Sequence, residues 1–323
     1  MTKKSSLHVG IIAPSSVVPA SEFLQGVEHL KRNGFTVDIH PTVLEQDYFY
    51  PANDEQRAAA IIEYAFRDDL DLIWCARGGY GATHLLPLLK KATARKKPGK
   101  KTLLGYSDAT ALLEFTRTHW DWNTIHAPMP SSKTFTQLKT SEWTSILEQI
   151  EVATTGRKVG SLSASSSFSS LKPVFLPKSA EAKKAITAPI VGGNLSVWNA
   201  LIGTEYAGVA KGKILFLEDI QENIARINRM IHHLDQSGGL KGVKAIVLGD
   251  FLDCNDTVMK VNDQPIRKTY PADEALDFIF RLLGEKLQIP IWKNLPVGHG
   301  PNYHAISLGR KYTLGTSGKL SPA

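Results

Sequence analysis

Residues 103–110 have the sequence Leu-Leu-Gly-Tyr-Ser-Asp-Ala-Thr, in which an apolar strand is followed at once by a turn and the start of a helix. We expect the strand over 101–106 and the helix over 109–118. The same alternation precedes this stretch three times, with strands over 7–13, 35–39 and 70–76 and helices over 22–33, 53–67 and 82–92. Strands that alternate with helices predict a parallel sheet covered by helices on both faces.

The length of the chain predicts two domains, because 323 residues are about twice the size of an ordinary domain. Between Ser161 and Ser170 seven of ten residues are serine and none is charged, which is typical of a linker. We therefore expect an α/β domain over 1–155, a linker over 156–187 and a second domain over 188–323. The second domain has strand patterns over 188–191, 213–217 and 243–248, helix patterns over 195–202, 222–234 and 271–283, and a predicted strand pair around Gly309 and Arg310.

Composition and charge exclude several classes of protein. Hydrophobic residues make up 42% of the chain and charged residues 21%, which excludes a mainly disordered protein. We attribute the net charge of +7 to solubility. Six lysines lie together in the segment 90–101, and their clustering does not require a nucleic-acid partner, so we expect none. The apolar run over 9–13 is too short for a signal peptide or a membrane span. Cys75 and Cys254 both lie in apolar runs and predict buried free thiols in a reducing compartment, so we expect a cytoplasmic protein without a membrane partner.

Ser107 is the first candidate for chemistry. Ligands bind at the carboxyl ends of the strands of a parallel sheet. A serine on a sharp strand-to-helix turn exposes its hydroxyl beside the N–H groups of the helix start, as in a nucleophile elbow. The sequence departs from the pattern G-x-S-x-G, because Ala109 stands in place of the second glycine. The alternative is that Ser107 is only the N-cap of the following helix.

The glycine-rich segment Arg77-Gly78-Gly79-Tyr80-Gly81 follows the preceding strand. Its glycines allow positive φ angles and a close approach of the backbone to a ligand. An amide of this loop and the amide after Ser107 could together form an oxyanion hole. A phosphate-binding loop and a plain tight turn are the alternatives, although neither glycine-rich phosphate motif is matched.

A serine nucleophile needs a base, and the base needs an orienting acid. His299 is bracketed by glycines directly after a predicted strand, and Glu218 ends another strand. We expect Asp219 to cap the next helix together with Glu222, which leaves Glu218 to face inward. No zinc motif is present, and we interpret the aspartates at positions 250, 253 and 256 as a polar loop rather than a calcium site.

Six blocks of sequence, taken in order, resemble the LD-carboxypeptidases, serine peptidases that include murein tetrapeptide carboxypeptidase and the microcin-immunity peptidases. The resemblance covers nearly the whole chain except the segment 130–187. The blocks are Gly10-Ile11-Ile12-Ala13-Pro14-Ser15, Ala76-Arg77-Gly78-Gly79-Tyr80-Gly81, Gly105-Tyr106-Ser107-Asp108, Gly192-Gly193-Asn194-Leu195, Leu217-Glu218-Asp219 and Gly298-His299-Gly300.

The resemblance implies a fold and a site. It implies a flavodoxin-like parallel α/β domain at the N-terminus, a smaller β-rich α/β domain at the C-terminus and an active site in the cleft between them. It implies Ser107 as nucleophile, His299 as general base and Glu218 as the residue that orients His299. The amides of Gly79 and Asp108 are implied as the oxyanion hole, and Arg77 and Asn194 as substrate-binding residues, Arg77 as a partner for a substrate carboxylate.

The resemblance also implies an activity. This is hydrolysis of the amide bond between an L-centre and a C-terminal D-amino acid, with a murein tetrapeptide giving a tripeptide and D-Ala during peptidoglycan recycling. A metal or cofactor is not part of that chemistry, and a homodimer is implied. Two alternatives stay open: cleavage of peptidyl-adenylate antibiotics, as in microcin immunity, and a two-lobed binding protein without turnover.

Overall fold

The computed structural model divides the chain into two compact units. The first unit comprises Met1–Ser166 and Tyr303–Gly309, and the second comprises Ser167–Asn302 and Arg310–Ala323. Within them the structure describes residues 7–156, 167–169, 171–178, 184–256, 260–261, 264–265 and 270–323. Most of the serine-rich segment 161–170 lies outside the described residues.

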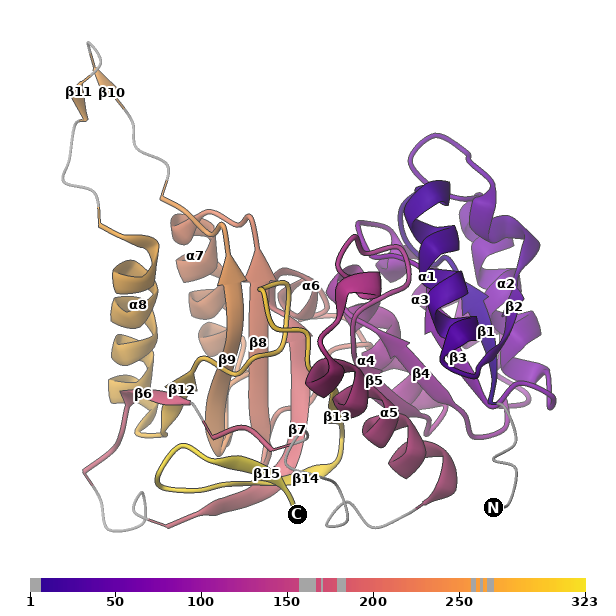
Figure 1. Ribbon diagram of the computed structural model, residues 1–323. Helices are drawn as coiled ribbons and strands as arrows, with labels where there is room; N and C mark the ends of the chain where they lie inside the picture. Colours follow the sequence, from indigo (N-terminus) through magenta and orange to yellow (C-terminus); the bar gives the residue numbers. More distant parts are fainter. Residues whose placement is uncertain are drawn as a thin grey trace. The chain divides into compact units, whose positions relative to one another are not determined.

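The first unit is built on a six-stranded sheet with the order β13-β5-β4-β3-β1-β2 (Figure 1). Strands β1 to β5 are parallel, and β13 joins the edge antiparallel to β5. The parallel order is that of flavodoxin-like sheets, which confirms the predicted fold class of this unit. The strands are β1 (His8–Ile12), β2 (Thr36–Ile39), β3 (Leu72–Cys75), β4 (Thr102–Gly105), β5 (Asn123–His126) and β13 (Ile306–Leu308).

The predicted helices of the first unit are present, and a fifth follows them. Asn53 and Gln56 form a capping box at the start of α2. Helices α2, α3 and α4 contact one another in sequence, whereas α1 contacts α5 through the rings of His29 and Trp143. The helices are α1 (Ala20–Arg32), α2 (Asp54–Phe66), α3 (Ala82–Ala92), α4 (Thr110–His119) and α5 (Thr140–Thr155), with short 3₁₀ helices η1 (Pro41–Leu44), η2 (Ser107–Ala109) and η3 (Phe135–Gln137).

The second unit contains a seven-stranded sheet with the order β15-β14-β7-β8-β9-β12-β6. Strands β7, β8, β9 and β12 are parallel, and the antiparallel strands lie at the two edges. The strands are β6 (Lys172–Phe175), β7 (Ile186–Asn194), β8 (Ile214–Ile220), β9 (Ala245–Leu252), β12 (Ile291–Lys293), β14 (Lys311–Leu314) and β15 (Leu320–Pro322), and a separate hairpin is formed by β10 (Lys260–Val261) and β11 (Gln264–Pro265).

Helices pack the apolar core of the second unit against this sheet. Leu215, Leu217 and Ile246 of the central strands are buried together with Ile227 of α7 and Phe280 of α8. These strands are continuous apolar runs because helices or other segments cover both faces of a parallel sheet. The helices are α6 (Leu195–Ala200), α7 (Ile224–Gln236) and α8 (Ala272–Leu287).

Two elements differ from the sequence prediction. The strands on either side of Gly309 and Arg310 do not pair with each other: β13 pairs with β5 in the first unit, and β14 pairs with β7 and β15 in the second. Alternation of residues predicted the strands, but it carries no information about their partners. Strand β6 lies within the segment 156–187 that was predicted as a linker, and Phe168 in the same segment bridges to Leu320.

Cys75 and Cys254 are both free and buried, as the sequence predicts. Burial raises the pKa of the Cys254 thiol to about 11 and raises that of Cys75 further. Both thiols are therefore neutral at pH 7 and behave as small apolar core residues. None of the helices in the described ranges is long and apolar enough to span a bilayer.

We expect Gly26→Ala to lower the free energy of unfolding by about 1–3 kcal/mol. Alanine in a helix interior normally gains about 1 kcal/mol over glycine. Here, however, its Cβ would lie 2.0 Å from the carbonyl oxygen of Pro130, so backbone must move. Denaturant unfolding followed by tryptophan fluorescence measures the effect. Glu28→Ala, on the exposed face of the same helix, is the control and should stay within about 0.5 kcal/mol of the unaltered protein. A more stable Gly26→Ala protein would contradict the packing described here.

Candidate active site

Ser107 lies at the sharp turn between β4 and α4, with a φ angle of +60°. This left-handed conformation is uncommon for a residue with a side chain and is a feature of strained strand-to-helix turns. Tyr106 precedes η2 as its N-cap and Ala109 precedes α4, and neither helix start has a side-chain cap. The N-cap interpretation of Ser107 is therefore wrong, and the geometry is that of an elbow that presents a hydroxyl.

Close packing of small residues forms this elbow. A Cβ on Gly78 would lie 2.8 Å from Cβ and 3.0 Å from Oγ of Ser107, so only glycine leaves room for the serine side chain. A Cβ on Gly105 would lie 2.9 Å from Cβ of Ala109. Glycine at position 105 on the strand therefore leaves room for the methyl group of Ala109, so alanine can stand where the elbow pattern has its second glycine.

Asp108 ties the elbow to the neighbouring helix. Its buried Oδ2 accepts a hydrogen bond of 2.9 Å from the amide of Ala82, at the start of α3. A carboxylate at a helix N-terminus is favourable because it satisfies an otherwise unpaired N–H. Burial raises the pKa of Asp108, while the hydrogen bond from the Ala82 amide acts in the opposite direction.

The glycine-rich loop after β3 is bound to the loop after β1. The amide of Ser16 donates to the carbonyl of Gly78 at 3.3 Å, and Oγ of Ser16 accepts from the amide of Tyr80 at 3.1 Å. Gly79 has a φ of +110°, and a Cβ there would lie 2.3 Å from Oγ of Ser16. Strands β1 and β3 flank the point where the sheet order reverses, which is where flavodoxin-like folds bind ligands.

Two backbone amides near Ser107 remain available to a ligand. Within the described part of the chain, neither the amide of Gly79 nor that of Asp108 donates to a protein acceptor. Arg77 is exposed, and its guanidinium donates to the carbonyl of Val17. This loop therefore offers unpaired N–H groups and a cation, a set of donors suited to an anionic group.

In the second unit, His299 and Glu218 are brought together as the sequence predicts. Nδ1 of His299 lies 2.6 Å from Oε2 of Glu218, at the end of β8. The Glu218 side chain has no solvent exposure, and that of His299 is 10% exposed. Gly298 has a φ of +136°, and a Cβ there would lie 3.1 Å from Oε2 of Glu218, so glycine lets the loop carry the imidazole onto the acid.

Burial and charge act against each other on this pair. Burial disfavours the imidazolium, but the charge and hydrogen bond of Glu218, together with the charges of Asp219 and Asp250, outweigh that effect and raise the pKa of His299 above its ordinary value. Burial also raises the pKa of Glu218, and the charge and hydrogen bond of His299 reduce the shift. With Nδ1 bonded to the acid, a proton exchanged with a substrate or a nucleophile would pass through Nε2 of His299.

Asp219 does not cap the following helix, which corrects the sequence prediction. Asn223 caps α7 by accepting from the amide of Ala225. Asp219 is still within β8, where successive side chains face opposite sides. Its carboxylate accepts from the amide of Ser196 at 3.0 Å, at the start of α6.

Asn194, predicted to bind substrate, has partners within the fold. Its Oδ1 accepts from the amide of Val197 at 3.1 Å and so caps α6. Its Nδ2 donates to Oδ1 of Asp219 at 3.0 Å, between neighbouring strand ends. The predicted residues are thus divided between the units: Ser107, Asp108, Gly79 and Arg77 belong to the first, and Asn194, Glu218 and His299 belong to the second.

Sequence reasoning assigned no role to Gly78 beyond its glycine-rich loop, and it interpreted Asp250 as part of a polar loop. Gly78 contacts the side chain of Ser107, and Asp250 contacts the loop that carries His299. The sequence signal for Asp250 is a glycine–acid pair at 249–250, directly after the strand predicted over 243–248.

Comparisons with known proteins place the chain in a family. Residues 9–127 match the LD-carboxypeptidase N-terminal domain, and residues 187–314 match the LD-carboxypeptidase C-terminal domain. The murein tetrapeptide carboxypeptidase of Pseudomonas aeruginosa is 29% identical over 319 residues, 95% of this chain and 92% of the relative. The microcin C7 self-immunity protein MccF of Escherichia coli is 27% identical over 258 residues, 75% of this chain and 74% of the relative.

A solved structure supports the same placement. The muramoyltetrapeptide carboxypeptidase from Oxalobacter formigenes matches with a TM-score of 0.71 and 27% identity, over 97% of each chain. Both halves of the chain thus match the two domains of one peptidase family. The protein belongs to the LD-carboxypeptidase family.

We expect the imidazole of His299 to titrate above the ordinary pKa of a histidine, and Glu218→Gln to lower that pKa. Glutamine keeps the size of the side chain but removes the charge that opposes the effect of burial. NMR titration of the ring protons measures the shift, with the His299 signal assigned by its loss in His299→Gln. Glu222→Gln, which removes a nearby acid bonded to Ser196 and Arg226, is the matched control and should leave the titration unchanged. An unchanged His299 pKa in Glu218→Gln would contradict the assignment of their contact.

Proposed function

We propose that the protein is a serine LD-carboxypeptidase that hydrolyses the amide bond between an L-centre and a C-terminal D-amino acid. The observation that carries the proposal is Ser107 at a φ of +60° between β4 and α4, in a chain whose two halves match the domains of this family. The contact between His299 and Glu218 provides the proposed general base and the acid that orients it.

In the proposed acylation step, Oγ of Ser107 attacks the amide carbonyl while Nε2 of His299 accepts its proton. Glu218 holds the imidazole through Nδ1 and stabilises the imidazolium that forms. Collapse of the tetrahedral intermediate breaks the C–N bond, and His299 returns the proton to the leaving amine of the D-amino acid. The step requires the hydroxyl of Ser107 to reach hydrogen-bond distance of His299 when substrate is bound.

The amides of Gly79 and Asp108 are proposed to bind the oxyanion. Their N–H groups have no protein acceptor in the described residues, so they need not break a bond to stabilise developing charge. Water then attacks the acyl-enzyme with His299 again as the base, releasing the shortened peptide. Arg77 is proposed to bind a substrate carboxylate, and Asn194 to line the site beside the acid strand.

The proposed substrate is a murein tetrapeptide that yields a tripeptide and D-Ala during peptidoglycan recycling. The relatives from Pseudomonas aeruginosa and Oxalobacter formigenes, whose names specify muropeptide substrates, support this choice. Two buried neutral thiols suit a reducing compartment, so we place the reaction in the cytoplasm. A homodimer is proposed as the working form.

We expect the purified protein to release D-Ala from a tetrapeptide that ends in D-Ala, and Ser107→Ala to lower the rate by at least about 1000-fold. The alanine removes the nucleophile without changing the size of the elbow. Quantification of free D-Ala over time measures both rates. Release of as much D-Ala by Ser107→Ala as by the unaltered protein would rule out the proposed mechanism. Thr110→Ser, a conservative change in the same helix start, is the control and should retain activity.

Parallel assays separate the alternatives. Cleavage of a peptidyl-adenylate and not of the tetrapeptide would assign the activity that the similarity to the microcin immunity protein favours. Failure to cleave either substrate, with tight binding that survives Ser107→Ala, would identify a binding protein without turnover. Labelling of Ser107 by a fluorophosphonate requires an activated hydroxyl and so supports an enzyme independently of substrate choice.

A further inference from the structure

Strand β9 has an irregular register opposite the proposed acid. Leu217 of β8 pairs with Leu248, but Asp219 pairs with Phe251, so two residues of β9 face the single residue Glu218. Such a bulge bends a strand and redirects a side chain, and bulges are frequent beside active sites. The two residues involved are Gly249 and Asp250.

The bulge packs directly against the loop that carries His299. The amide of Gly300 donates to Oδ2 of Asp250 at 3.0 Å, and the amide of Asp250 donates to the carbonyl of Val297 at 3.3 Å. The loop is thus bonded to the same aspartate just before and just after the histidine.

A glycine in the loop and a glycine in the bulge allow the two segments to pack this closely. A Cβ on Gly300 would lie 2.2 Å from Cγ of Asp250, and a Cβ on Gly249 would lie 2.2 Å from the carbonyl oxygen of Val297. Both distances are too short for any side chain. The loop and the bulge therefore meet at backbone contact distance, a close fit that fixes the position of the loop.

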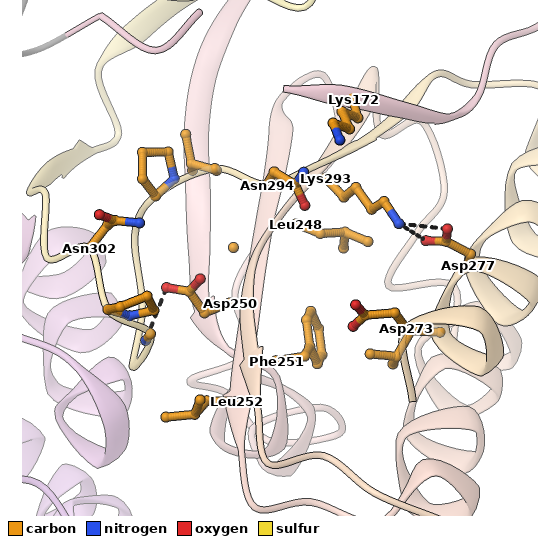
Figure 2. Close-up of a pocket in the computed structure, with 16 residues that line it drawn as sticks. Lys172, Leu248, Asp250, Phe251, Leu252, Asp273, Asp277, Lys293, Asn294 and Asn302 are labelled. Carbon is orange, nitrogen blue, oxygen red and sulfur yellow. Dashed lines mark hydrogen bonds and ion pairs between the residues drawn. The ribbon is translucent and has the colours of Figure 1, made fainter. Parts of the chain in front are cut away.

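One side of Asp250 faces an open cavity of about 520 Å³ that lies within the second unit. Figure 2 shows its carboxylate directed at the loop, and Asp273 on the opposite wall of the cavity without a bond to the loop. Lys293, a cation of the cavity wall, is bonded instead to Asp277 at 2.6 Å. In the described part of the chain, the one hydrogen bond of the Asp250 carboxylate comes from the amide of Gly300 in the loop.

We propose that Asp250 is a positioning residue for the general base: its hydrogen bond to the amide of Gly300 holds the 297–300 loop so that Nδ1 of His299 stays bonded to Glu218. The proposal rests on the proposed function for its kinetic consequences, but the geometry of His299 can be measured without substrate. Asp250 does not touch the reacting atoms in this scheme, and it acts through the loop.

Removal of the acceptor should lower kcat and leave KM nearly unchanged. In Asp250→Ala the Gly300 amide loses its partner and the imidazole is displaced, which we expect to reduce kcat by about 10- to 100-fold with a change in KM below about threefold. Asp250→Asn keeps an oxygen that can accept from the same amide, so we expect it to recover most of kcat. Asp273→Ala is the matched control, because it removes a carboxylate from the same cavity and should change neither constant.

A pH profile separates positioning from general damage to the fold. The carboxylates that act on His299 are Glu218 and Asp219 from β8 and Asp250 from β9, and all three raise its pKa. Asp250→Asn removes one of these charges while keeping the hydrogen bond. The acid limb of kcat/KM, which reports neutral His299, should therefore move to lower pH, whereas Asp273→Ala should leave it in place. The pKa of Asp250 itself is raised by burial to about 6, so the aspartate is mostly charged at pH 7.

The substrate-free measurement is the low-field NMR resonance of the Nδ1 proton of His299. We expect this signal in the unaltered protein and in Asp250→Asn, and its loss or broadening in Asp250→Ala. An unchanged signal together with kcat within twofold in Asp250→Ala would overturn the proposal. If Asp250→Ala does not fold, loss of the Nδ1 signal in a folded Asp250→Asn protein, which keeps the acceptor for the Gly300 amide, overturns it instead. If the unaltered protein cleaves neither substrate, the proposed function fails, while the resonance still decides the role of Asp250.

Discussion

The contact between the buried carboxylate of Glu218 and the imidazole of His299 is the interaction on which the site in the second unit depends. Removing an ion from water costs several kcal/mol unless a partner compensates it. His299 supplies that compensation at 2.6 Å, but only because the loop passes over the end of β8 at contact distance. Glycine at position 298 and the bulge in β9 both follow from this approach. The acid therefore determines the loop sequence around it, as well as the charge on the histidine.

The first unit meets a different requirement, which is to leave two backbone N–H groups beside Ser107 without a protein acceptor in the described residues. The carboxyl ends of its parallel strands lie at one edge of the sheet, where the loops after β1 and β3 are hydrogen-bonded to each other. Gly78 and Ser107 occupy space that two side chains could not share. The positive φ of Ser107 costs on the order of 1 kcal/mol or more, and the packing around the elbow must maintain it.

Local patterns predicted the elements of this fold well, and long-range pairing could not be predicted from them. The capping box at Asn53 and the inward-facing Glu218 depend on near neighbours or on alternation along one strand. The pairing of β13 with β5 and of β14 with β7 joins strands more than a hundred residues apart. Asp219 was misassigned because an acid before a helix resembles a cap, whereas β8 continues through that position and Asn223 caps α7. The role of Asp250 depends on a register shift, which no local pattern records.

The division of residues between the units also divides their physical roles. Glu218, Asp219 and Asp250, the carboxylates that raise the pKa of His299, all belong to the second unit. The hydroxyl of Ser107 and the two unpaired amides belong to the first. The charges that raise the pKa of the proposed base are therefore supplied by the unit that carries it, whereas the proposed nucleophile and oxyanion donors are carried by the other unit.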